Sequence, residues 1–87
     1  MEWIDGLAGE LAQEALSEEE TATLLAAARS VAHRVERRVT PLSAFLLGCA
    51  VGQGLQDGTA TRWELVQETI GQLESLLPPE SPPDQTE

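Results

Sequence analysis

An 87-residue chain with 15 acidic residues, five arginines and no lysine has a formal net charge of −10, and its length allows one small domain. Phosphate backbones and anionic lipids repel so acidic a chain, which excludes general nucleic-acid binding and attachment to membrane surfaces. Few aromatic residues among many aliphatic residues and alanines are typical of helices packed on helices, so we expect an all-α fold.

The N-terminal half of the chain predicts two helices. Trp3, Leu7 and Leu11 recur at four-residue steps, which indicates a first helix over residues 2–16. The segment Ser17–Glu20 has the sequence of a capping box, so a second helix is expected to begin at residue 18 and to continue to residue 38. Its acidic start and its arginine-rich end both suit the helix dipole.

A third helix is expected after Thr40, because Pro41 disfavours helical geometry at Thr40 and is well suited to a first helical turn. Thr40 is therefore the predicted N-cap. The following residues are apolar on almost every side, which predicts the central and most buried helix of a four-helix bundle. Ala44, Gly48 and Gly52 repeat at four-residue steps and leave a smooth groove for the close approach of another helix, within the chain or between subunits.

The C-terminal part predicts one more helix, over residues 62–77, with a capping box at its start and a clean apolar stripe that begins at Trp63. Core packing is one interpretation of Trp63, and a place in a partner interface is the other. Residues 1–77 are expected to form a single helical domain. The acidic, proline-rich residues 78–87 are expected to be a disordered tail.

Residue types also suggest where the protein resides. The lone Cys49 excludes an internal disulfide, and its apolar neighbours are typical of a buried, unreactive thiol. The longest apolar run, residues 44–52, is far shorter than the ~20 residues that a membrane span needs. The N-terminus lacks the pattern of a signal peptide, so we expect a cytoplasmic protein.

Residues 29–38 hold four of the five arginines and the only histidine, so this junction is the candidate site. One interpretation is a site for phosphate or carboxylate, formed by basic side chains of this stretch together with the start of the third helix. The other is an ordinary solvated face whose arginines pair with nearby glutamates. No catalytic residue and no metal ligand set can be assigned, since His33 lacks a recognisable nucleophile and no ligand spacing is present. The candidate anion-binding residues are His33, Arg34, Arg37, Arg38 and Thr40.

Several of these residues also carry a family resemblance. The chain resembles a small helical family of actinobacteria, of unknown function, whose members occur alone or fused to molybdenum cofactor guanylyltransferase-like proteins. The resemblance implies an accessory role near molybdenum cofactor biosynthesis, and it implies no guanylyl transfer because this chain has no such domain. The residues that carry it are Trp3, Leu7, Val31, Ala32, His33, Arg37, Thr40, Pro41, Leu42, Phe45, Leu46, Gly48, Ala50 and Gly52.

We therefore expect a non-enzymatic interaction or accessory module without a cofactor. The alternative is a small domain that binds an anionic or phosphorylated ligand at the Arg/His cluster. Four short helices leave too little material to cover the third helix on every side, so a homodimer is expected. Its predicted interface residues are Ala44, Gly48, Gly52 and Trp63, and a further protein partner is expected in molybdenum cofactor metabolism.

Overall fold

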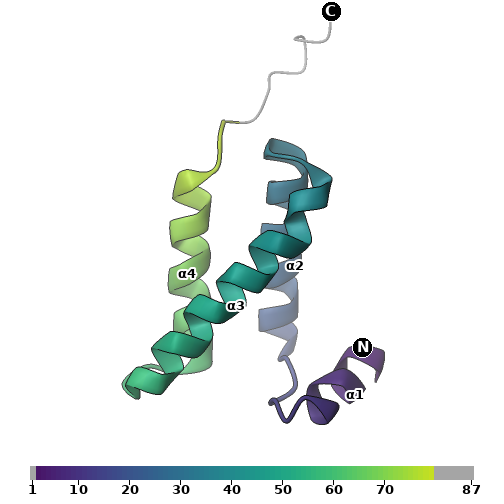
Figure 1. Ribbon diagram of the computed structural model, residues 1–87, viewed down its shortest axis with the longest axis vertical. Helices are drawn as coiled ribbons and strands as arrows, with labels where there is room; N and C mark the ends of the chain where they lie inside the picture. Colours follow the sequence, from purple (N-terminus) through teal and green to yellow (C-terminus); the bar gives the residue numbers. More distant parts are fainter. Residues whose placement is uncertain (1, 80–87) are drawn as a thin grey trace, which may run out of the picture.

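The computed structural model describes residues 2–79, and in this part of the chain every regular element is helical. The predicted all-α fold with four α-helices is confirmed. In chain order the elements are α1 (Glu2–Glu10), α2 (Glu18–Arg34), a 3₁₀ turn η1 (Arg37–Val39), α3 (Thr40–Asp57) and α4 (Arg62–Leu76). Figure 1 shows α2 and α4 running side by side, α3 crossing both of them diagonally, and α1 lying apart.

Two capping boxes fix where α2 and α4 begin, as the sequence predicts. The Ser17 hydroxyl accepts from the Glu20 amide at 3.0 Å, and the Glu20 carboxylate accepts from the Ser17 amide at 2.9 Å. Thr61 and Glu64 make the same reciprocal pair at 3.0 and 3.1 Å. Each box satisfies amide groups that no helical carbonyl can reach, so both helices start at a defined residue.

The small core lies where α2, α3 and α4 meet. It is built from Ala27 of α2, Val51 of α3, and Val66 and Ile70 of α4, with half-buried Trp63 packed against it. Val31 of α2 is the most deeply buried large side chain among the described residues. Three helices therefore form the packed unit, and α1 makes no contact with any of them at the level of the backbone.

Helix α1 is shorter than predicted, ending at Glu10 instead of residue 16. Ala12 adopts a left-handed conformation with φ 58°, and the Ala12 and Gln13 amides bond back to Gly9 and Ala8. Such a turn closes a helix and reverses the course of the chain. The apolar spacing continues past this point, which is why periodicity alone predicted a longer helix.

The junction before α3 also differs from the prediction. Helix α2 ends at Arg34, four residues early, and the 3₁₀ turn leads directly into α3. Thr40 has helical backbone angles and is the first residue of α3, so it is not the N-cap; Val39 holds that position without a side-chain bond. The proline ring would clash with a helical carbonyl four residues before it, so α2 cannot continue up to Pro41.

Burial of α3 is the third difference. The helix contacts both α2 and α4, yet Val51 is its only buried residue. Because α1 does not fold back over it, the opposite side of α3 remains open. The predicted disordered tail, residues 78–87, lies outside the described residues from position 80 onward.

Candidate functional site

An apolar strip on the open side of α3 is the most unusual surface of the described chain. Leu42, Phe45 and Leu46 are 63%, 70% and 66% exposed, and Cys49 one turn further on is also exposed. The spacing of 3, 1 and 3 residues places all four side chains on one side of the helix. We call these four residues the α3 face. The expectation that Cys49 is buried is wrong, because no described residue covers this side of α3.

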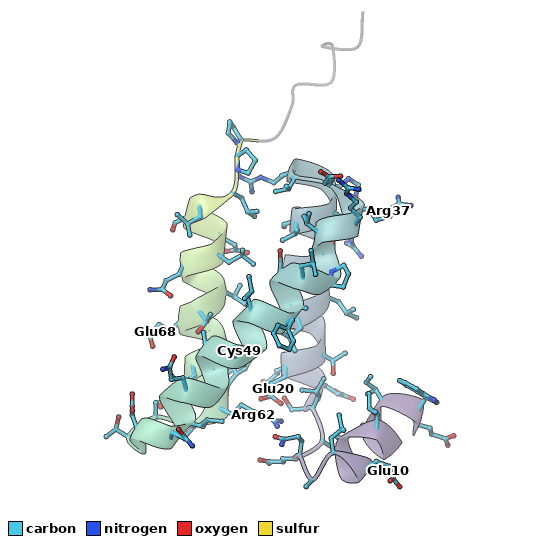
Figure 2. All side chains as sticks on the ribbon, in the orientation of Figure 1. Glu10, Glu20, Arg37, Cys49, Arg62 and Glu68 are labelled. Atoms are coloured by element: carbon cyan, nitrogen blue, oxygen red, sulfur yellow. The ribbon has the colours of Figure 1, made fainter. Side chains whose placement is uncertain are left out.

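Positive charge gathers at the end where the α3 face begins. Arg37 and Arg38 lie in the turn just before α3, and both are exposed. Arg38 pairs with Glu36 at 3.2 Å, but its side chain is 85% exposed, so this ion pair contributes little to stability. Figure 2 places Arg37 at this end of the molecule and Arg62, the fifth arginine, at the opposite end.

The predicted anion-binding residues do not gather in one hollow. His33 and Arg34 share a shallow depression with Arg29 and Ser30, of about 250 Å³. The Arg34 Nε also donates to the Pro78 carbonyl at 2.8 Å, and Pro78 does not line the depression. Arg37 and Arg38 lie outside this depression, so anion binding stays a prediction that binding measurements must test.

Thr40 belongs to a different feature, an open apolar cavity of about 250 Å³ between α2, α3 and α4. Its hydroxyl oxygen is buried and has no hydrogen-bond partner among the described residues. Small residues of α3, Ala44 and Gly48, widen the cavity, and Leu24 and Leu73 form part of its wall. Ser43 also lines the cavity and the rest of its wall is apolar, so two hydroxyl residues stand in a largely apolar surround.

The predicted interface residues are divided between surface and core. Ala44, Gly48 and Gly52 are exposed, and a Cβ atom added at either glycine would meet nothing within 4 Å. The close crossing within the chain is at Gly54 instead, where an added Cβ would lie 2.7 Å from the Leu65 Cδ2 atom of α4. Trp63 packs against the core, which favours the core interpretation of this residue.

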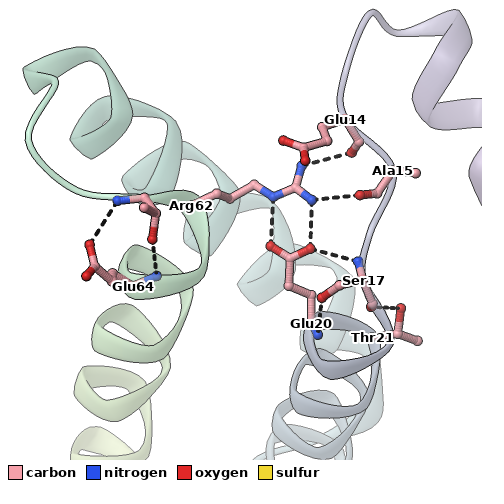
Figure 3. A network of polar contacts seen from close by, with 8 residues as sticks. Glu14, Ala15, Ser17, Glu20, Thr21, Arg62 and Glu64 are labelled. Atoms are coloured by element: carbon pink, nitrogen blue, oxygen red, sulfur yellow. Dashed lines mark hydrogen bonds and ion pairs between the residues drawn. The ribbon is translucent and has the colours of Figure 1, made fainter.

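Sequence reasoning missed the most extensive polar network, which centres on Arg62 (Figure 3). Its guanidinium group donates to both carboxylate oxygens of Glu20, at 2.8 and 2.7 Å. It also donates to the carbonyls of Glu14 at 2.8 Å and Ala15 at 2.9 Å. We call these contacts the Arg62 clamp, because they join the start of α4, the start of α2 and the segment that leads back to α1.

Charge and burial explain the strength of this clamp. The Glu20 residue is 4% exposed, and a buried carboxylate needs a partner. The Arg62 hydrogen bonds, helped by the Ser17 amide, hold the pKa of Glu20 below its usual value, although burial acts in the opposite direction. The same bonds raise the pKa of Arg62. The sequence gives one sign of this role: Arg62 is the only arginine outside residues 29–38, and it is the first residue of a helix that begins with a capping box.

The clamp leaves α1 projecting with its own apolar side uncovered. Trp3 is 75% and Leu11 61% exposed, and Leu7 between them is also exposed. In Figure 1, α1 points away from the other helices, and it makes no backbone contact with α3. The structure therefore presents two separate apolar strips.

Comparison with known proteins gives a family and no function. No curated protein and no solved structure matches the chain. Within residues 2–79, no helix is long and apolar enough to cross a membrane, and no three histidine, cysteine or acidic residues are grouped as metal ligands would be. Residues 1–84 match a family described as a domain of unknown function, DUF6457. The chain therefore belongs to this DUF6457 family.

Proposed function

We propose that this protein is a non-enzymatic helical interaction module, and that the α3 face is its docking surface. The observation that carries the proposal is the exposure of Leu42, Phe45 and Leu46 side by side on one helix. Single exposed apolar residues are ordinary, but a contiguous strip of large ones is typical of a surface that another protein covers. Arginines at one end of the strip add a charged rim, and many protein interfaces combine an apolar centre with such a polar rim.

A photo-crosslinking amino acid in place of Phe45 tests this function in living cells. A discrete protein adduct is expected at position 45, because a docked partner lies against that side chain. The matched control carries the same group in place of Glu68, which is exposed on α4 (Figure 2). If the group at position 45 gives no adduct, or only the diffuse products seen at position 68, the strip faces only solvent.

The pathway is proposed from the family resemblance alone. The string from Val31 to Gly52 that resembles domains fused to molybdenum cofactor guanylyltransferase-like proteins includes three residues of the α3 face, Leu42, Phe45 and Leu46. An accessory role in molybdenum cofactor biosynthesis follows if the position-45 adduct contains an enzyme of that pathway. Unchanged molybdoenzyme activity in cells that lack this protein would contradict the pathway assignment while leaving the docking surface in place.

A second candidate function is binding of a small anionic or phosphorylated ligand. It is supported by the depression that Arg29, Ser30, His33 and Arg34 share, because it collects two guanidinium groups and an imidazole. Thermal-shift measurements with inorganic phosphate, nucleotides and pterin phosphates test it. Stabilisation by one of these compounds that is lost in Arg29→Gln and kept in Arg38→Gln, an exposed arginine outside the depression, supports the site. A flat response to all of them refutes it.

A further inference from the structure

We infer that the α3 face is covered by helix α1 of a second copy of this chain. In the resulting homodimer each copy contributes one α1 and receives one on its own α3 face, as a two-fold axis requires. This inference rests on the proposed function, because it names the partner of the same surface.

The two strips match in kind and in length. Trp3 and Leu7 of α1, with Leu11 just after its last residue, follow one side over eight helical steps, a rise of about 12 Å. On α3, the strip from Leu42 to Cys49 rises about 10 Å. Each is a two-turn apolar strip that no residue in positions 2–79 covers, and Trp3 adds the large aromatic side chain that interface centres favour.

Charges at the ends of the strips are complementary. Helix α1 contains Glu2, Asp5 and Glu10 and no basic residue, whereas Arg37 and Arg38 precede the α3 face. Because the acidic residues stand at both ends of α1, a carboxylate lies near the arginines whichever way α1 runs. The net charge of −10 on each copy opposes association, but salt screens such repulsion beyond about 8 Å at physiological ionic strength. The pairs at the strip ends would be closer than that.

The Arg62 clamp is the reason for choosing a second copy over the chain's own α1. Arg62 donates hydrogen bonds to the carbonyls of Glu14 and Ala15. Just before them, the chain turns at Ala12, whose backbone is in the left-handed conformation. The backbone N–H of Gln13 donates to the Ala8 carbonyl at 2.8 Å, and this bond fixes the orientation of α1 relative to the turn. With these bonds in place α1 points away from its own α3 (Figure 1), so only another molecule can bring the two strips together.

Disulfide trapping between two distinguishable copies tests the arrangement. One copy keeps Cys49, the single native cysteine, and the other carries Cys49→Ser with Leu7→Cys. Mild oxidation of the mixture is expected to give a dimer that contains one copy of each kind. Glu68→Cys in place of Leu7→Cys is the control, and it should give no mixed dimer because Glu68 is exposed on α4, away from both strips.

Three outcomes would overturn the inference. Cross-linking of Cys49 only to another Cys49 would show α3 packed on α3. A disulfide within one chain that carries both Leu7→Cys and native Cys49 would show that α1 covers its own α3. Sedimentation of the unmodified protein as a monomer at every concentration would show that copies do not associate.

Sedimentation of charge variants gives an independent readout. Phe45→Glu is expected to raise the dimer dissociation constant at least tenfold, since it places a carboxylate in the middle of the α3 face. Leu55→Glu, on the same helix but on another side, should change it less than threefold, and circular dichroism should show unchanged helicity for Phe45→Glu. Equal weakening by both variants would contradict the assignment. If the protein is monomeric while position 45 still cross-links to a different protein in cells, this inference fails and the proposed function stands.

Discussion

Replacing Arg62 with methionine removes the guanidinium group of the Arg62 clamp and keeps a long, helix-compatible side chain. The Glu20 side chain is 6% exposed and that of Arg62 21%, so water replaces the lost bonds poorly. Removing one member of a buried ion pair costs about 3–5 kcal/mol. Arg62 is partly reached by solvent, so we expect the lower end, about 3 kcal/mol of unfolding free energy. In a domain of this size that lowers Tm by about 12–24 °C.

Urea denaturation followed by circular dichroism at pH 7 measures this loss. Arg29→Met is the matched control, because Arg29 is exposed in the middle of α2 and makes no hydrogen bond or ion pair among the described residues. The double variant Glu20→Gln with Arg62→Met should be more stable than Arg62→Met alone, since no unpaired carboxylate remains buried. The reasoning is refuted if Arg62→Met and Arg29→Met differ by less than about 0.5 kcal/mol, the usual spread of surface substitutions.

Three further predictions follow from the same structure. The Arg62 hydrogen bonds lower the pKa of Glu20, so wild type should be more stable than Glu20→Gln at neutral pH. This difference in unfolding free energy should shrink as the pH falls below about 4.5, and parallel urea titrations of the two proteins measure it. Gly48→Ala should raise the unfolding free energy by about 1 kcal/mol, because alanine has the higher helix propensity and nothing obstructs its Cβ atom. Gly54→Ala should raise it less, because the Leu65 side chain of α4 must move. Equal thermal shifts for the two variants would contradict this. Thr40→Val should stabilise the fold, because it removes a buried hydroxyl without a partner among the described residues. Thr61→Val should lower the unfolding free energy by about 1 kcal/mol, because it removes an N-cap. Thermal melts that shift in the same direction for both variants would contradict the observed caps.

Local signals in the sequence were sufficient for the starts of α2 and α4. A capping box involves residues three positions apart, so Ser17 and Glu20, or Thr61 and Glu64, can be read without tertiary knowledge. Pro41 likewise marked the start of α3, and the 3.6-residue periodicity indicated α1 and the apolar stripe of α4. It could not find the end of α1, because the left-handed turn at Ala12 interrupts an apolar spacing that continues beyond it.

The candidate site was predictable only in part. An apolar third helix with arginines before it was visible in the sequence, but apolar composition predicts burial and says nothing of what covers the helix. Exposure of Phe45 depends on where α1 goes, and that depends on Arg62, which lies more than 40 residues away from its partners. A single arginine at the start of a helix carries no local sign of such a long-range contact.

The Arg62 clamp has a consequence for the order in which the chain folds. Its bonds join Arg62 to positions 42, 47 and 48 residues earlier in the chain. During synthesis, the first helix therefore leaves the ribosome long before the residue that sets its direction exists. Until α4 docks, the early segment can sample many orientations, and contacts so distant in sequence form late because closing the loop is entropically costly. Assembly of copies through that helix would then have to wait for a complete chain, which protects nascent molecules from premature association.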